Sequence, residues 1–176
     1  SARLHTYSRI QFSTMTKPTT PASQVLDRVL VLEMVRVTEA AAIAASKLVG
    51  RGDEEAADAA AVEAMRAALN ELAMDGTVVI GEGERDEAPM LFIGEKVGSA
   101  QGTGPKIDIA LDPLEGTTIT AKAGPNALAV LAVAEEGNLL SAPDVYMDKL
   151  AVGPGYPEGI IDLAKTPTEN VKAVAA

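Results

Sequence analysis

The chain of 176 residues contains no cysteine and no tryptophan, and its single histidine, His5, lies close to the first residue. Without cysteine there can be no disulfide, no thiolate nucleophile and no zinc site with cysteine ligands. A lone histidine at this position also argues against a histidine-based catalytic group or metal cluster. Any catalysis must therefore depend on carboxylates, hydroxyls and a bound metal ion.

Positive charge is also scarce, because 15 Lys and Arg residues stand against 25 Asp and Glu residues, giving a formal net charge of -10. Nucleic acids and anionic membranes are bound by basic surfaces, so we expect neither as a partner. No apolar run approaches the ~20 residues of a membrane-spanning helix. The absence of cysteine is compatible with the cytosol, and we expect a cytoplasmic protein.

Aromatic residues make up only 3% of a chain that is 47% hydrophobic, so alanine and aliphatic side chains must fill the core of one domain. Residues 1–22 contain basic residues and many Ser and Thr but no acid. This composition is typical of a transit peptide or of sequence upstream of a natural start at Met15, and we favour the second interpretation. In either case we expect residues 1–22 to be a disordered extension.

Two helices are predicted first, over residues 23–49 and 54–74, separated by Gly50-Arg51-Gly52 and with Asp53 as the N-cap of the second. The apolar stripe of the second helix, extended back by one turn, reaches Asp58. A carboxylate on a buried helix face is costly unless it is paired or metal-bound, but Asp58 also lies near the helix start, where solvent or the helix dipole can stabilise it. Both interpretations remain open. Glu63 and Arg66 look like a solvated surface pair.

Apolar runs predict strands over residues 77–80, 106–111 and 127–134, and two more over residues 139–140 and 145–152. The first is followed by Gly81-Glu82-Gly83. An acid between two glycines at a strand end indicates backbone crowding around a ligand, although a solvated turn gives the same pattern. Residues 88–97 are compatible with a short helix or strand, and a further helix is expected near Pro167.

The central motif is Asp112-Pro113-Leu114-Glu115-Gly116-Thr117-Thr118. We expect Asp112 to close the preceding strand and Pro113 to begin a helical turn that points Asp112 and Glu115 to the same side. Gly116 would leave the backbone open to close approach. Two carboxylates beside a hydroxyl suit Mg²⁺ or Mn²⁺ holding a phosphate. The alternative is an Asp N-cap followed by a first-turn Glu.

Acids at the ends of several predicted elements form a coherent set: Asp58, Glu82, Asp112 and Glu115. Two-metal phosphoryl hydrolysis needs such carboxylates to hold two ions about 4 Å apart, and a nearby threonine hydroxyl can orient the attacking water. A purely structural interpretation leaves these acids without a reason.

The segment Asp112-Pro-Leu-Glu-Gly-Thr117 resembles the signature of the lithium-sensitive, metal-dependent sugar and inositol phosphatases. Between about Leu30 and Gly155 the chain more closely resembles one family, the bacterial class II fructose-1,6-bisphosphatases. The stretches that carry this resemblance are Arg36-Val-Thr-Glu-Ala-Ala-Ala, Gly50-Arg-Gly-Asp53, Asp75-Gly-Thr-Val-Val-Ile-Gly-Glu-Gly-Glu84, Asp86-Glu-Ala-Pro-Met-Leu91, Ile93-Gly-Glu-Lys-Val-Gly98 and Ala142-Pro-Asp-Val-Tyr-Met-Asp-Lys149.

The resemblance implies an α/β (α+β) protein with a layered α-β-α sandwich. It implies hydrolysis of the 1-phosphate of fructose 1,6-bisphosphate in gluconeogenesis, with Mn²⁺ or Mg²⁺ in a two-metal site, by a homo-oligomer, a dimer or tetramer. Its implied residue roles are one metal at Asp58 and Glu82, a second at Asp112 and Glu115, water activation by Thr117, and substrate binding by Glu115, Gly116, Thr117 and Tyr146. Without the resemblance, Tyr146 would be interpreted as a strand tyrosine half-buried against the core.

Two features depart from the family pattern. Glu54 occupies a position where the family often has Lys, so a basic group near the site is lost. Family members are also about twice as long as the matched portion, and their second half supplies basic phosphate-binding residues and a further metal-binding glutamate. We therefore expect residues 23–155 to be the N-terminal phosphatase domain and residues 156–176 a linker and the start of a C-terminal domain.

Two alternatives to this enzyme remain. The chain can be a catalytically incomplete fragment that binds metal or phosphate, or a related sugar or inositol phosphatase. The first differs from the main hypothesis in lacking metal-dependent turnover.

Overall fold

The computed structural model describes residues 28–83, 89–140 and 148–176. The chain divides between Leu140 and Ser141 into two compact units, which we describe separately. The predicted boundaries at residues 22 and 155 stay predictions. The first unit contains, in chain order, α1 (Arg28–Ser46), α2 (Glu54–Glu71), β1 (Asp75–Ile80), β2 (Lys96–Val97), β3 (Lys106–Glu115), α3 (Thr117–Ala121) and β4 (Leu128–Glu135). The second contains α4 (Pro167–Ala175).

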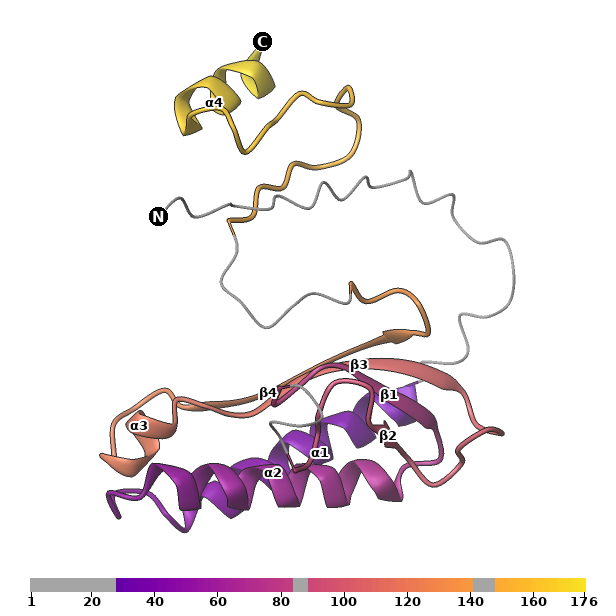
Figure 1. Ribbon diagram of the computed structural model, residues 1–176, viewed down its shortest axis with the longest axis vertical. Coiled ribbons are helices and arrows are strands. Elements are labelled where there is room, and N and C mark those ends of the chain that lie inside the picture. The colour runs from indigo at the N-terminus through magenta and orange to yellow at the C-terminus, as the bar shows by residue number, and fades with distance from the viewer. Residues whose placement is uncertain (1–27, 84–88, 141–147) are drawn as a thin grey trace, which may run out of the picture. The chain divides into compact units, whose positions relative to one another are not determined.

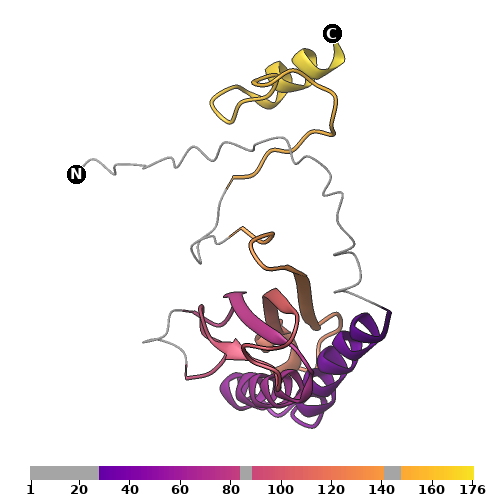
Figure 2. The ribbon, with the colours of Figure 1, turned by 90° about the vertical axis from the view of Figure 1, so that its right-hand side faces the viewer.

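The helices α1 and α2 pack side by side on one face of the sheet (Figures 1 and 2). Both were predicted from their apolar spacing. Alanines on the two inner faces, including Ala41 and Ala61, are completely buried, so small side chains allow the helices to approach closely. Asp53 caps α2 as predicted, because its carboxylate accepts a 2.9 Å hydrogen bond from the N–H of Ala56. No helix in the described segments is long and apolar enough to cross a membrane.

The sheet has the strand order β2-β1-β3-β4, in which β1 and β3 are parallel and the other pairs antiparallel. Alternate residues of β3 point to opposite faces, so Ile107 and Ile109 join the helix-facing core while Asp108 lies on the other face. The buried Asp108 carboxylate accepts hydrogen bonds from the N–H groups of Gly137 (2.7 Å) and Leu139 (3.3 Å), which anchors the turn after β4.

The first unit thus supplies one helix layer and one mixed sheet. On the face of the sheet opposite α1 and α2, β4 exposes Leu128 and Val130. The mixed α/β class is confirmed, whereas the third layer of an α-β-α sandwich stays a prediction, because the long helices of this unit lie on one face. β4 is also the last strand at its side of the sheet within the described residues.

The second unit is small and locally organised. The helix expected near Pro167 is confirmed, and Thr166 and Glu169 form a reciprocal capping box at its start. Buried Asn170 donates to the carbonyl oxygens of Asp162 (2.9 Å), Lys165 (3.3 Å) and Thr166 (3.2 Å). Its own side-chain oxygen accepts from the N–H of Asp162 at 2.8 Å.

The additional strands predicted after β4 are wrong where the structure describes them. Residues 139–140 and 148–152 are irregular, and residues 148–152 are exposed. An apolar run forms a strand only when a neighbouring strand pairs with its backbone, and these residues have no such partner among the described ones.

Candidate functional site

The predicted acids gather near one edge of the sheet. β1 and β3 run parallel, with Val78 opposite Ile109 and Ile80 opposite Ala110, so the carboxyl ends of both strands lie at this edge. Glu82 follows the end of β1 by two residues, and Asp112 follows Ala110 by two residues. The carboxyl ends of parallel strands are the usual place for ligand binding in such sheets.

The conformation around Asp112 differs from the prediction. The segment Asp112–Glu115 does not begin a helix but continues β3, since Glu115 still pairs with Leu128 of β4. The register shifts between Asp112 and Glu115, and such an irregularity accommodates Pro113, which cannot donate a ladder hydrogen bond. The Asp112 carboxylate accepts a 3.1 Å hydrogen bond from the N–H of Leu114. Pairing with β4 therefore overrides the local preference for a helical turn.

The helix predicted in this region begins four residues later than expected. Gly116 is its N-cap and has a left-handed backbone with φ 103°, which explains why glycine is needed there. A side chain at this position would also come within 3.1 Å of Cδ1 of Ile119. Thr117 is the first residue of α3 and is half-buried. The motif thus places three features close together in the sequence. These are the carboxylate of Asp112 in β3, the turn at Gly116 and the hydroxyl of Thr117 at the start of α3.

Asp58 lies on the same side of α2 as the buried residues Val62, Met65 and Leu69, as the stripe predicted. It is half-buried, and this partial burial raises the pKa of its carboxyl group. Burial is also the main reason why the pKa of Asp112 is raised. The negative charges of Glu115 and Asp58 raise the pKa of Asp112 further, while the hydrogen bond from Leu114 partly offsets both effects.

This mutual influence is the clearest sign that the acids converge. Asp58 and Asp112 lie on different elements and are 54 positions apart in the sequence, yet the charge of Asp58 contributes to the raised pKa of Asp112. Even so, no three acidic side chains in the described part of the chain are grouped closely enough to hold one metal ion. The assignment of two metals to Asp58, Glu82, Asp112 and Glu115 therefore stays a prediction.

Gly81, which precedes Glu82, is crowded by the protein's own backbone, which neither interpretation of this segment predicted. A side chain at Gly81 would collide with the carbonyl oxygen of Leu91, so the crowding comes from the protein itself. The N–H of Glu82 donates to the same carbonyl at 3.1 Å, and the N–H of Ile93 donates to Gly83 at 2.9 Å. These contacts fix the backbone of Glu82. Tyr146, predicted to bind substrate, lies outside the described residues.

One contact near the site had no counterpart in the sequence prediction. The Thr118 hydroxyl donates a 2.7 Å hydrogen bond to the carboxylate of Glu54, which lies one helical turn before Asp58 on α2. The loop between α1 and α2 adds two backbone hydrogen bonds to the end of α3, from Gly50 to Thr120 and from Gly52 to Ala121, both 2.9 Å. The start of α2 and the predicted catalytic Thr117 are thus held in one local framework.

Another missed interaction concerns Arg66. It is not part of a solvated pair with Glu63, because its Nε donates at 2.6 Å to the buried carboxylate of Glu95. Glu95 also accepts a hydrogen bond from the N–H of Leu91. Nothing in the local sequence around Glu95, which directly precedes β2, indicated that its carboxylate would contact α2.

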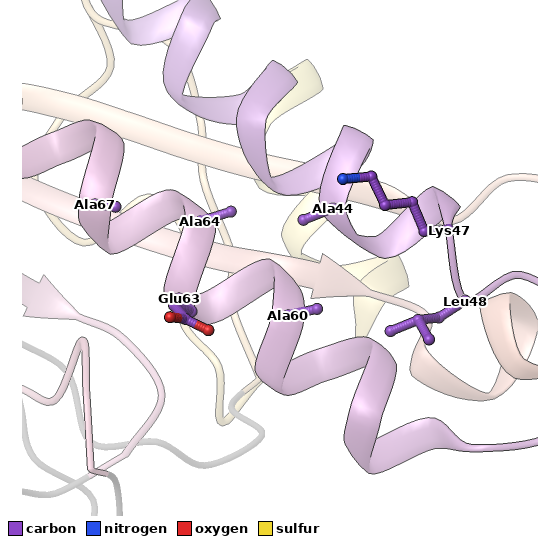
Figure 3. Close-up of a pocket in the computed structure, with 7 residues that line it drawn as sticks. All are labelled: Ala44, Lys47, Leu48, Ala60, Glu63, Ala64 and Ala67. Carbon is purple, nitrogen blue, oxygen red and sulfur yellow. The ribbon is translucent and has the colours of Figure 1, made fainter.

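A groove of about 510 Å³ lies on the outer side of α1 and α2 (Figure 3). Because successive helix residues are turned by about 100°, its α2 residues lie on the side of that helix opposite Asp58. The groove contains a single acid, so it is not a candidate metal site. Its lining residues are Ala44, Lys47, Leu48, Ala60, Glu63, Ala64 and Ala67.

Comparison with known proteins decides the family. Residues 28–176 match the family described as bacterial fructose-1,6-bisphosphatase, glpX-encoded. The chain belongs to this family. It is 58% identical over 149 residues to fructose-1,6-bisphosphatase 1 class 2 of Escherichia coli. It is 54% identical over 150 residues to D-fructose 1,6-bisphosphatase class 2/sedoheptulose 1,7-bisphosphatase of Prochlorococcus marinus.

These matches include 85% of the chain but only 44% of either relative. This chain therefore spans less than half the length of the curated relatives it matches. The match covers every element of the described first unit and α4. It includes all the predicted site residues, from Asp58 to Tyr146.

Proposed function

We propose that the chain contributes metal-binding and phosphate-binding residues to a phosphatase that hydrolyses the 1-phosphate of fructose 1,6-bisphosphate. The observation that carries this proposal is the electrostatic coupling of Asp112 to Asp58 and Glu115 at the carboxyl end of β3. Asp58 and Asp112 are half-buried and Glu115 is exposed, and a divalent cation would relieve the repulsion between their charges. Membership of the bacterial fructose-1,6-bisphosphatase family supports this reaction and substrate class.

The donor set fits Mg²⁺ or Mn²⁺ because it consists of carboxylate oxygens with no sulfur or imidazole nearby. Asp58 and Glu82 would hold one ion, and Asp112 and Glu115 the other. When bound, such ions neutralise phosphoryl oxygens and lower the pKa of bound water. The half-buried Asp112 and Asp58 would then favour their ionised forms.

The roles of the chain's own groups follow from the turn after β3. The Thr117 hydroxyl would orient the attacking water, and the left-handed Gly116 would leave its backbone accessible to a phosphoryl oxygen. Water forms the new bond to phosphorus while the bond from phosphorus to the sugar C1 oxygen breaks. That oxygen takes up a proton, and fructose 6-phosphate and inorganic phosphate leave. We place this reaction in gluconeogenesis in the cytoplasm.

A second candidate function is favoured by one specific observation. The described residues contain no group of three acids that could hold a metal ion. The chain by itself would then bind metal or phosphate without turnover. Activity on sedoheptulose 1,7-bisphosphate is a further proposal, drawn from the name of the Prochlorococcus marinus relative.

The deciding experiment measures Mn²⁺ binding by calorimetry and phosphate release from fructose 1,6-bisphosphate by the 176-residue chain. Asp112→Ala is the test variant, and Glu63→Ala is its matched control, because Glu63 is an exposed acid on the opposite side of α2. Turnover that needs both Mn²⁺ and Asp112 supports the phosphatase. Mn²⁺ binding that needs Asp112 without turnover supports the second candidate, and a folded chain that shows neither contradicts both.

A further inference from the structure

Leu91 has a strained backbone beside the predicted site. Its φ of 54° is left-handed, a conformation that costs free energy for a residue with a large side chain. Among the described residues other than glycine, Ala123 and Asn126 also have a positive φ, but both are exposed, whereas Leu91 is completely buried. Strained backbone persists only where the surrounding structure holds it, and it is often found at functional sites.

Both backbone polar groups of Leu91 are held by other segments. Its carbonyl oxygen accepts a 3.1 Å hydrogen bond from the N–H of Glu82. Its own N–H donates to Oε2 of Glu95, whose side chain is only 7% exposed. The second oxygen of that carboxylate, Oε1, accepts a 2.6 Å hydrogen bond from Nε of Arg66 on α2. One carboxylate oxygen therefore fixes Leu91, and the other is fixed by α2.

The main chain around Glu95 is anchored independently of this carboxylate. The carbonyl oxygen of Glu95 accepts a 2.9 Å hydrogen bond from the N–H of Val78 in β1, and the N–H of Gly94 donates to the carbonyl of Val78 at 2.7 Å. These two bonds hold the segment before β2 against the strand that leads to Glu82. Loss of the carboxylate would therefore release Leu91 without detaching this segment from the sheet.

The same contacts connect two predicted metal ligands to one helix. Asp58 lies on α2 itself, eight positions before Arg66. Glu82 is joined to the same helix through Leu91 and the ion pair. A buried ion pair often adds no net stability compared with apolar residues of the same volume, so stability alone explains this pair poorly. Its place between the two predicted ligands points to geometry.

We propose that Arg66 and Glu95 are positioning residues for Glu82. Through the carbonyl group of Leu91, they hold the backbone of Glu82 at a fixed place relative to Asp58. The consequence for metal binding rests on the proposed function, in which Asp58 and Glu82 hold one ion. Replacement of residues that orient metal ligands typically weakens metal binding by about 10–100-fold.

The test uses substitutions in the full 176-residue chain. Arg66→Met removes the cation, and Glu95→Gln leaves one side-chain oxygen for two donors. Arg66→Lys is the conservative variant. Because the donating atom of Arg66 is Nε, the lysine Nζ, one bond farther along the side chain, still reaches Glu95. Val37→Ala is the control for general destabilisation, because Val37 is buried in α1, which contains none of the predicted ligands.

The first measurement is amide hydrogen exchange of Glu82 by NMR in EDTA, relative to the amide of Ile109 in the central strand β3. Neither substitution removes the carbonyl that accepts from Glu82, so faster relative exchange reports a displaced Leu91. We expect an increase of about tenfold or more for Arg66→Met and Glu95→Gln. Arg66→Lys should stay close to the original chain. Val37→Ala should affect the amides of Glu82 and Ile109 alike.

The second measurement is Mn²⁺ affinity by calorimetry at a temperature where circular dichroism shows each chain to be folded. We expect affinity to fall about tenfold or more for Arg66→Met and Glu95→Gln. It should be largely restored in Arg66→Lys and unchanged in Val37→Ala. If Glu95→Gln does not fold, the comparison of Arg66→Met with Arg66→Lys decides alone.

Two results would overturn the proposal. One is relative exchange of Glu82 that stays unchanged in a folded Arg66→Met chain. The other is an equal effect of Val37→Ala on relative exchange or on Mn²⁺ affinity, which would indicate a general loss of stability. An original chain that binds no Mn²⁺ contradicts the proposed function instead, and the exchange measurement in EDTA then decides the positioning of Glu82 by itself.

Discussion

The hydroxyl of Thr118 donates a 2.7 Å hydrogen bond to the carboxylate of Glu54, joining the first turn of α3 to the first turn of α2. The two residues are 64 positions apart in the sequence. Because Thr118 directly follows Thr117, this contact links the predicted catalytic hydroxyl to the helix that contains Asp58. The acidic residue that departs from the family pattern at position 54 therefore has a structural role here.

Removal of this hydrogen bond should reduce stability only modestly, because both residues are exposed. We expect Glu54→Ala and Thr118→Val to show a coupling free energy of about 0.5–1.5 kcal/mol in a double-mutant cycle. Urea unfolding of the four proteins measures it. Thr118→Ser keeps the hydroxyl and should retain the coupling. Strictly additive effects of the two substitutions would show that the contact contributes nothing in solution.

The raised pKa of Asp112 predicts a pH-dependent stability in the absence of metal. The folded protein keeps the Asp112 proton to a higher pH than the unfolded chain does. The ionised form therefore destabilises the folded state, and stability falls as the pH rises through the folded pKa. Asp112→Asn should stabilise the chain at neutral pH, and this gain should shrink to nothing below the unfolded pKa of about 3.9.

Denaturation in EDTA between about pH 4 and pH 8 checks this sign. Asn keeps the oxygen that accepts the hydrogen bond from Leu114, so the comparison isolates the charge. Glu63→Gln, at an exposed position, is the control and should show no such trend. If the stabilisation by Asp112→Asn grew as the pH fell, the ionised Asp112 carboxylate would not be destabilising the folded chain. Addition of Mn²⁺ at neutral pH should make the original chain more stable than Asp112→Asn.

Gly81→Ala should destabilise the chain and disturb Glu82. The added methyl group would meet the Leu91 carbonyl oxygen and come within 2.6 Å of Cγ1 of Val78, so the backbone must shift. Overpacking of this kind costs about 1–3 kcal/mol. Gly153→Ala is a suitable control, because a methyl group there has no neighbour within 4 Å. Urea unfolding reports the stability, and Mn²⁺ calorimetry should show weaker binding for Gly81→Ala alone.

Arg66→Met should be more harmful than an ordinary surface substitution. It keeps most of the side-chain stem but leaves the buried Glu95 carboxylate with the N–H of Leu91 and no cation. We expect a loss of about 1–3 kcal/mol, reduced from that of a fully buried pair because Arg66 is 41% exposed. Lys106→Met breaks an ion pair in which both side chains are exposed and should cost under about 0.5 kcal/mol. Urea unfolding measures the stability of both variants. Equal losses of unfolding free energy for Arg66→Met and Lys106→Met would contradict this prediction.

Local patterns in the sequence were sufficient to predict most of the first unit. Apolar spacing identified α1 and α2, the Asp53 cap was confirmed, and apolar runs located β1, β3 and β4. Asp58 was recognised because its position continued an apolar stripe. Each of these features depends on neighbours within a few turns of the chain, which is why they can be predicted from the sequence.

Features that depend on distant partners were not predictable in the same way. The motif at Asp112 looked like a helix start, yet β4 extends the strand to Glu115. The contact between Arg66 and Glu95 joins residues 29 positions apart, and no local signal marks it. The glycines around Glu82 were interpreted as crowding around a ligand or as a solvated turn, whereas a side chain at Gly81 would collide with the backbone at Leu91. In each case tertiary pairing determined the outcome.

The position of β4 has a consequence for folding in the cell. Its eight residues, Leu-Ala-Val-Leu-Ala-Val-Ala-Glu, contain no proline and no charge before the last position. Within the described sheet this strand has a neighbour only on the β3 side. Native sheets usually protect such a border with lysine, proline or a covering segment, since unpaired backbone groups there recruit other strands. While the chain is folding, β4 is therefore the place where aggregation should begin and where a chaperone should bind.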